Sequence, residues 1–234
     1  MLVEHVFDTE NHLYKVEGEF CLSTSAVIEL IGLRDVSQVP LAALEFAGHR
    51  GSAVHRAIQA YEEDQDVEDA IREYEKESDV MVMDTVLERM ALYYRFRDQH
   101  EVKLCGTMEK SYVYRHEGTE YLIGGTPDLP CTVDGVFSVL DVKTTHPNSG
   151  AAALQDMLKW KCQLQSYQEI LTEAYQKGPE KFILHLHPKL RDKPRGQITG
   201  FNLHHIVSDD SLLWDSAIRV AMAKVSHGFK LEGK

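Results

Sequence analysis

Gly124-Gly-Thr-Pro-Asp128 and Phe137-Ser-Val-Leu-Asp-Val-Lys143 are the two stretches of this sequence that decide its fold. Side chains alternate between the two faces of a strand, so the second stretch places Asp141 and Lys143 on the same face. Both faces also carry apolar residues, which is typical of an interior strand. A carboxylate and an ammonium are costly to bury there unless they are paired or bind a ligand. The pattern therefore predicts a site at one edge of a sheet.

Asp128 arrives just before this strand, after a Gly-Gly-Thr-Pro segment that lets the backbone pass close to a ligand. Two carboxylates and a lysine suit a hard divalent cation and a polarised water molecule. The alternative is a surface salt bridge at the end of a strand, without any ligand. These three residues alone leave both interpretations open.

Length and composition favour one folded domain. The chain has 234 residues, and its hydrophobic content of 43% is sufficient for a large core. We expect a single domain over residues 1–234, with a mainly helical flank at 1–104 that carries His55 and a sheet core at 105–234.

Cysteine usage and the first residues indicate a cytoplasmic protein. The four cysteines are scattered singly, so they predict neither a disulfide framework nor a zinc site. The first ten residues carry acids where a signal peptide needs a basic and then an apolar run. No apolar stretch of about 18 residues follows, so we expect no membrane segment.

The charge is unevenly distributed along the chain. A net charge of -12 argues against a protein that coats nucleic acid by bulk attraction. Residues 62–79 hold ten acidic and only two basic residues, which is typical of a solvated helix or linker. A basic loop stands apart from this run, and we interpret it as a hairpin tip or a contact for backbone phosphates. Its cations are Lys189, Arg191, Lys193 and Arg195.

Periodicity predicts helices in the first half of the chain and a mixture of strands and helices in the second. We expect a hairpin within residues 5–20 and a helix at 26–31 that Ser23-Thr-Ser25 caps. Further helices are predicted at 40–47, 49–61, within 67–99, at 151–176 and at 212–225, and strands at 108–115, 121–124, 181–187 and 197–206.

Four further residues are candidates for the predicted site. His55 lies beside the apolar stripe of its helix, where a boundary residue without a ligand is the alternative. Glu109 lies at the beginning of a predicted strand and is either an exposed edge acid, another metal carboxylate or a residue that aligns the lysine. Gln163 and Tyr167 are four residues apart on one helical face, although Tyr167 also fits the core.

The order of these residues resembles the RecB-like branch of the PD-(D/E)XK nuclease superfamily. The matching segments are Gly51-Ser-Ala-Val-His55, Glu109, Gly125-Thr-Pro-Asp128, Asp141-Val-Lys143 and Gln163-Leu-Gln-Ser-Tyr167. Residues 14–20 and 23–28 also look like the beginning of short, stand-alone exonucleases of phage and mitochondrial type. The resemblance implies an α/β fold with a central mixed β-sheet, flanked by helices and preceded by a helical N-terminal part.

The resemblance also implies roles for these residues. His55, Glu109, Asp128 and Asp141 would hold Mg²⁺ or Mn²⁺, and Lys143 would act on the attacking water. Gln163 and Tyr167 would contact DNA or brace the site. An imidazole ligand should favour Mn²⁺ relative to a site made of oxygen atoms alone. No iron-sulfur cluster is expected because no cysteine follows Cys162, and no phosphate-binding loop predicts a bound nucleotide.

The implied function is that of a DNA exonuclease in recombination, repair or replication, leaving 5′-phosphate and 3′-hydroxyl ends. Its partners would be DNA ends and recombination or replication proteins, and the gene could be phage-encoded. A structure-specific endonuclease of the same fold is one alternative. A non-catalytic protein that binds DNA ends on a nuclease scaffold is another.

Overall fold

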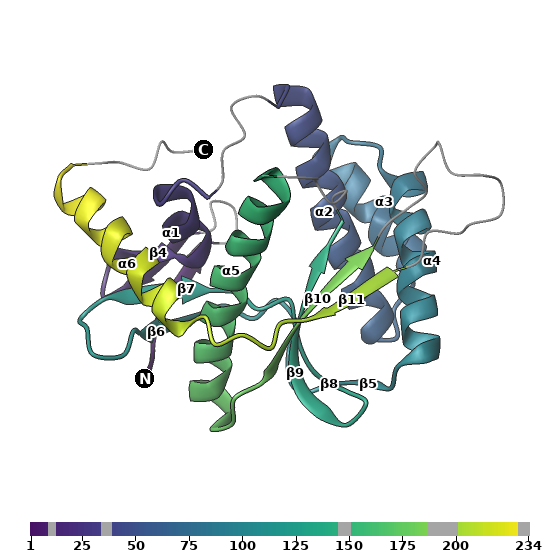
Figure 1. Cartoon of the computed structure of the whole chain (residues 1–234). Coiled ribbons are helices and arrows are strands. Elements are labelled where there is room, and N and C mark those ends of the chain that lie inside the picture. The colour runs from purple at the N-terminus through teal and green to yellow at the C-terminus, as the bar shows by residue number, and fades with distance from the viewer. Residues whose placement is uncertain (9–12, 34–38, 145–150, 187–200, 229–234) are drawn as a thin grey trace.

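The structure is a computed structural model, and it describes residues 1–8, 13–33, 39–144, 151–186 and 201–228. Figure 1 shows two separate β-sheets with helices packed against them. The predicted α/β class with a mixed sheet and flanking helices is confirmed. No helix in these ranges is both long enough and apolar enough to cross a membrane.

The sheet that carries the predicted site has five strands, in the order β11-β10-β9-β8-β5. It is mixed, because β9 runs parallel to β10 while the other neighbours pair antiparallel. The central strand is buried along nearly its whole length, as its sequence predicts. The strands are β5 (Val102–Leu104), β8 (Leu129–Val133), β9 (Val136–Lys143), β10 (Glu180–Leu186) and β11 (Phe201–His205).

Helices cover both faces of this sheet. Leu140 and Val142 of β9 pack with the first helical group, which consists of α2 (Leu41–Glu62), α3 (Val67–Ser78) and α4 (Met83–Gln99). Phe137 and Val139 face the opposite group, formed by α1 (Thr24–Leu30), α5 (Ala151–Tyr175) and α6 (Ser211–Ser226). Because side chains alternate along β9, Asp141 and Lys143 lie on the face that α5 covers.

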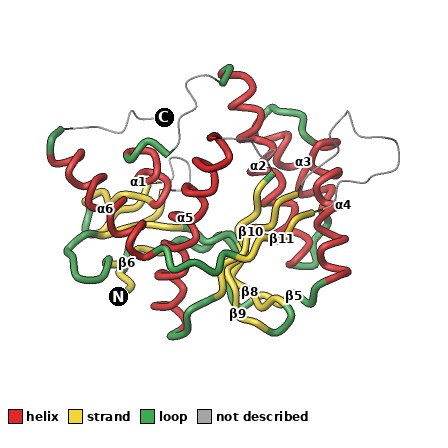
Figure 2. The backbone as a smooth tube through the Cα atoms, in the orientation of Figure 1, coloured by secondary structure: helices red, strands yellow, loops and turns green. Residues whose placement is uncertain are grey.

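A second sheet, which the sequence does not predict, lies on the other side of α5 (Figure 2). Its six strands are ordered β1-β6-β7-β4-β3-β2. The predicted hairpin before Asp128 belongs to this sheet, because β4 pairs in parallel with β7 and recruits it. The strands are β1 (Leu2–Val3), β2 (Val6–Asp8), β3 (Leu13–Val16), β4 (Glu19–Ser23), β6 (Tyr112–Arg115) and β7 (Leu122–Gly125).

Two helix predictions differ from the structure. The pieces expected at 40–47 and 49–61 form one helix, because Gly48 and Gly51 lack the positive φ with which glycine ends a helix. The pattern over 67–99 is instead divided after Asp79, whose φ of 55° is left-handed. The Glu75 carboxylate then accepts hydrogen bonds from the backbone N–H groups of Val82 and Met83, which caps α4.

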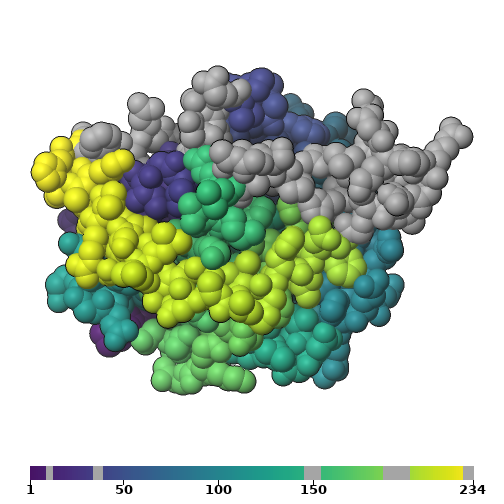
Figure 3. Space-filling view, viewed as in Figure 1, coloured from purple at the N-terminus to yellow at the C-terminus, as the bar shows by residue number. Residues whose placement is uncertain are grey.

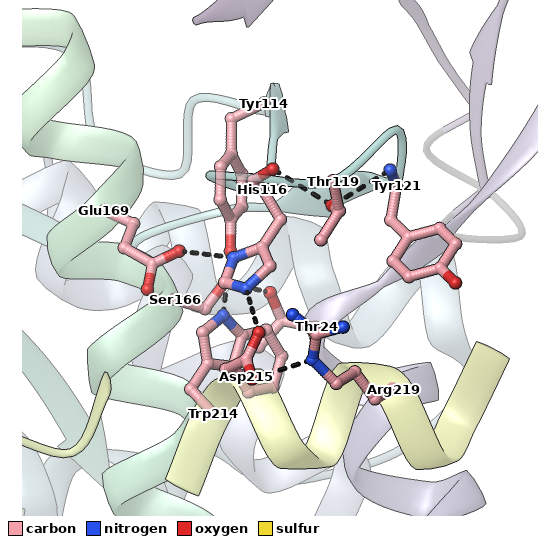
Figure 4. Close-up of polar contacts among 10 residues, drawn as sticks. All are labelled: Thr24, Tyr114, His116, Thr119, Tyr121, Ser166, Glu169, Trp214, Asp215 and Arg219. Atoms are coloured by element: carbon pink, nitrogen blue, oxygen red, sulfur yellow. Dashed lines mark hydrogen bonds and ion pairs between the residues drawn. The ribbon is translucent and has the colours of Figure 1, made fainter. Parts of the chain in front are cut away.

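A polar cluster fastens α6 and α5 to the second sheet (Figure 4). His116 is 5% exposed, and its two ring nitrogens lie 3.1 Å from Glu169 of α5 and 3.2 Å from Asp215 of α6. Trp214 Nε1 donates a hydrogen bond of 2.8 Å to the Tyr114 hydroxyl. The chain between β11 and α6 crosses the front of the molecule in Figure 3 and brings α6 to this cluster.

Candidate active site

The two aspartates meet because β8 and β9 are antiparallel neighbours. Leu129 pairs with Leu140, which places Asp128, immediately before β8, beside Asp141. The Val142 backbone N–H donates a hydrogen bond of 2.9 Å to Asp128 Oδ2. Asp128 is 6% exposed and Asp141 is completely buried, so both carboxylates lie within the fold.

Lys143 lies between Asp141 and α5. Its Nζ is 2.6 Å from Asp141 Oδ2 and donates a hydrogen bond of 3.0 Å to Gln163 Oε1. Gln163 Nε2 in turn donates to the Tyr167 hydroxyl at 3.0 Å. The spacing of four residues on α5 therefore aligns a chain of contacts that fixes the lysine.

His55 and Glu109 approach the aspartates from the side of the first helical group. His55 Nδ1 lies 2.8 Å from Glu109 Oε1, and His55 Nε2 lies 3.3 Å from the Val142 carbonyl oxygen and 3.8 Å from Asp128 Oδ2. The sequence context predicted that Glu109 begins a strand, and this prediction is wrong. Glu109 lies in a turn with φ of 50°, before β6 begins at Tyr112. This turn aims its carboxylate at the histidine instead of along a sheet edge.

Three of the four predicted metal ligands form one group. His55, Glu109 and Asp128 each offer a ligand atom, and these atoms lie within 4.8 Å of one another. Asp141 is adjacent but is engaged by Lys143. Apart from this ion pair, neither Asp141 oxygen has a hydrogen-bond partner in the described part of the chain. A completely buried carboxylate with unused oxygen atoms, beside three further N and O ligands, fits a divalent cation.

The close packing of these groups shifts their pKa values. Burial raises the pKa of Asp128, and it raises that of Asp141 to about 6 even though Lys143 opposes the shift. Burial by itself would lower the pKa of His55, but Asp128 and Glu109 outweigh it and raise the pKa to about 9. The pKa of Lys143 is also raised, because Asp141 and Asp128 together outweigh burial. Both cations are therefore charged at neutral pH when no metal is bound.

Close packing requires both glycines before Asp128. A Cβ atom at Gly124 would lie 2.3 Å from the Tyr14 ring, and one at Gly125 would lie 2.6 Å from Ile170 Cδ1. The Tyr14 hydroxyl shares a hydrogen bond of 2.6 Å with Thr126 Oγ1 and so steadies the segment that leads to Asp128. The sequence did not point to Tyr14, because this contact depends on the unpredicted second sheet.

One predicted group lies outside the described residues. It is the basic loop with Lys189, Arg191, Lys193 and Arg195. All the other predicted site residues lie together around the ends of β8 and β9.

Comparison with known proteins identifies the family. A family model for the PD-(D/E)XK nuclease superfamily matches residues 28–219. A crystal structure from Eubacterium rectale, described as a "putative exonuclease", is 15% identical with a TM-score of 0.47, over 81% of this chain and 76% of that one. The structure of SSO0001 is 14% identical with a TM-score of 0.35, over 77% and 76% of the two chains. A search of curated protein sequences finds no match. The family match spans most of the chain and includes every residue of the site, so this protein belongs to the PD-(D/E)XK nuclease superfamily.

Proposed function

We propose that this protein is a metal-dependent DNA exonuclease of the RecB-like branch, and that residues 1–234 form one nuclease domain. The observation that carries the proposal is the group of His55, Glu109 and Asp128 next to the buried Asp141–Lys143 pair. Clusters of buried carboxylates with one lysine suit the hydrolysis of a phosphodiester. The family match crosses both the helical part and the sheet part, which supports a single domain.

In this proposal His55, Glu109, Asp128 and Asp141 hold Mg²⁺ or Mn²⁺. When bound, such an ion lowers the pKa of a water molecule and neutralises phosphate charge. His55 would hold the ion through a neutral imidazole, so it would have to give up its proton on binding.

Lys143 has a separate role in the proposal. Asp141 and Gln163 fix its ammonium, and its raised pKa favours the charged form. A charged lysine supports stabilisation of the negative charge that develops on the phosphate in preference to removal of a proton from water. Gln163 and Tyr167 act through the lysine, as positioning residues.

The test is digestion of linear DNA labelled at the 5′ or the 3′ end, single- or double-stranded, with Mn²⁺ present. We expect release of the label from one end, products with 5′-phosphate and 3′-hydroxyl groups, and no cleavage of a covalently closed circle. Cleavage of the circle would replace the exonuclease with an endonuclease. Binding of DNA ends without any cleavage would favour a non-catalytic scaffold.

Three variants test the roles of the individual residues. Asp128→Ala, Asp141→Ala and Lys143→Ala should each abolish cleavage while the circular dichroism spectrum remains that of the folded protein. A variant that retains a near-normal rate would remove its residue from the mechanism. The proposal places the enzyme in the cytoplasm, in DNA recombination, repair or replication, with DNA and the proteins of those processes as partners.

A further inference from the structure

Two arginines lie near each other beside the active site, and neither forms an ion pair with a carboxylate of the described residues. Arg50 lies on α2, and the neighbouring Gly51 packs against Thr144, since a Cβ atom there would be 3.8 Å from Thr144 Oγ1. Arg89 lies on α4 and is 4% exposed. Thr144 directly follows Lys143, so α2 and α4, which carry the two arginines, meet the chain next to the proposed catalytic lysine.

Within the described part of the chain, the hydrogen bonds of Arg89 go to backbone oxygen atoms. Its Nη1 donates to the Thr85 carbonyl at 2.7 Å, and its Nε and Nη2 lie 3.4 Å from the Thr144 carbonyl oxygen. These bonds hold the guanidinium in place, but carbonyl oxygen atoms do not neutralise its positive charge. Burial, followed by the nearby charge of Arg50, lowers the pKa of Arg89 to about 10. Glu88 opposes this effect, but it is exposed and forms no ion pair with Arg89 within the described residues.

Arg50 has no partner of any kind among the described residues. Its Nε is buried without a hydrogen bond, and none of the ion pairs among the described residues involves Arg50. Burial also lowers the pKa of Arg50. The side chain is only half-buried, so a ligand can reach it from solvent. A desolvated guanidinium beside a second cation is unfavourable unless an anion binds there.

Other arginines of the first helical group behave differently. Arg56 pairs with Glu73 and Glu77, and Arg72 pairs with Glu68 and Asp69. The group is rich in acids, so a partner for Arg50 would be easy to supply. Arg50 and Arg89 form no ion pair with a carboxylate within the described residues, and Arg50 is half-buried with a buried Nε that lacks a hydrogen bond. Arg95 of α4 has no ion pair there either, but it is exposed to solvent.

We propose that Arg50, backed by Arg89, binds a phosphate of the DNA strand adjacent to the phosphate that is cleaved. This inference rests on the proposed function and extends it to the binding of the substrate strand. A guanidinium matches the geometry of phosphate oxygens and reads no base, so the contact is independent of sequence. In a protein with a net charge of -12, a local cation pair of this kind also offsets repulsion of the polyanion.

The first test needs neither metal nor DNA. Inorganic phosphate should raise the melting temperature of the wild type, and Arg50→Gln should lose this stabilisation. Arg72→Gln is the matched control, because it removes the same charge from an ion-paired arginine, and it should respond like the wild type. Arg50→Gln should also unfold at no lower temperature than the wild type without phosphate. Equal stabilisation of all three proteins by phosphate would overturn the inference.

The second test locates the contact on DNA. Neutral methylphosphonate linkages are placed one at a time along an oligonucleotide, and KM and kcat are measured with Mn²⁺. For the wild type, one linkage beside the cleavage site should raise KM about tenfold, as expected for one charge-assisted contact. Arg50→Gln should raise KM by a similar factor and should show no further effect of that linkage. The slope of log KM against log salt concentration should also decrease by about 1, as expected for the loss of one phosphate contact.

The outcomes separate this inference from the proposed function. If the wild type cleaves DNA but every methylphosphonate acts equally on the wild type and on Arg50→Gln, the phosphate contact is wrong and the nuclease stands. If the wild type does not cleave DNA but Arg50 alone accounts for stabilisation by phosphate, the anion site stands and the nuclease assignment fails.

Discussion

Metal binding at this site should be strongly pH-dependent, because one of its ligands is protonated in the free protein. Asp128 and Glu109 outweigh the burial of His55 and raise its pKa to about 9. A divalent ion needs the neutral imidazole, so binding must displace that proton. The perturbation is therefore a change of pH between 7 and 8, in a range where Asp141, with a pKa of about 6, is already ionised.

The size of the pH effect on metal binding follows from the difference between the pH and the pKa of His55. With a pKa of about 9 for His55, roughly 1% of the imidazole is neutral at pH 7, which costs metal binding about 3 kcal/mol. The association constant for Mn²⁺ should rise about tenfold between pH 7 and pH 8. About one proton should be released for each ion that binds at pH 7.5. Because the folded pKa of His55 is raised, the metal-free protein should also lose stability as the pH rises from about 6.5 through 9.

Isothermal titration calorimetry with Mn²⁺, in buffers of different ionisation enthalpy, measures both the affinity and the proton release. His55→Gln should bind Mn²⁺ with little dependence on pH between 7 and 8. His205→Gln, which removes an exposed histidine paired with Glu180, should retain the slope of the wild type. A wild-type affinity that changes less than threefold over this range, or an unchanged slope in His55→Gln, would refute the reasoning.

Three other perturbations test separate parts of the structure. Gly124→Ala forces a Cβ to within 2.3 Å of the Tyr14 ring, so urea unfolding should show a free energy of unfolding that is lower by about 2–4 kcal/mol. The loss should be smaller in a Tyr14→Ala background, and additive losses would contradict the packing. His116→Phe removes the pairing of His116 with Glu169 and Asp215, while Arg219 still pairs with Asp215, and it should cost about 2 kcal/mol in the same assay. The cost should decrease as the pH rises, since the pKa of His116 is raised; a cost that does not depend on pH would contradict this. Lys143→Met should abolish cleavage but keep or tighten Mn²⁺ binding in calorimetry, because it removes a cation next to the ligands; weaker binding would make the lysine part of the metal site.

The central strand and the residues at its end could be predicted from local pattern. Alternation along 137–143 gave an interior strand with Asp141 and Lys143 on one face, and the structure buries that strand as expected. The spacing of four between Gln163 and Tyr167 likewise predicted a shared helical face, and both side chains follow Lys143 in one chain of hydrogen bonds.

Features that depend on contacts between distant parts of the chain could not be predicted from the sequence. The second sheet forms because β4 pairs with β7, about 100 residues later in the chain, and no local pattern encodes that contact. The position of Glu109 in a left-handed turn was missed for a different reason, because the alternation beyond it resembles a longer strand. Arg50 gave no signal in the sequence, because an unpaired arginine is recognised only when the positions of the acids around it are known.

The most direct test of the account is to measure, for the same protein samples, DNA cleavage and Mn²⁺ binding as functions of Mn²⁺ concentration. We expect cleavage of a linear, end-labelled duplex to rise with occupancy of the site, to vanish in EDTA, and to be absent in Asp128→Asn, which should also bind Mn²⁺ far more weakly. Cleavage that persists in EDTA, or in Asp128→Asn at the wild-type rate, would contradict it.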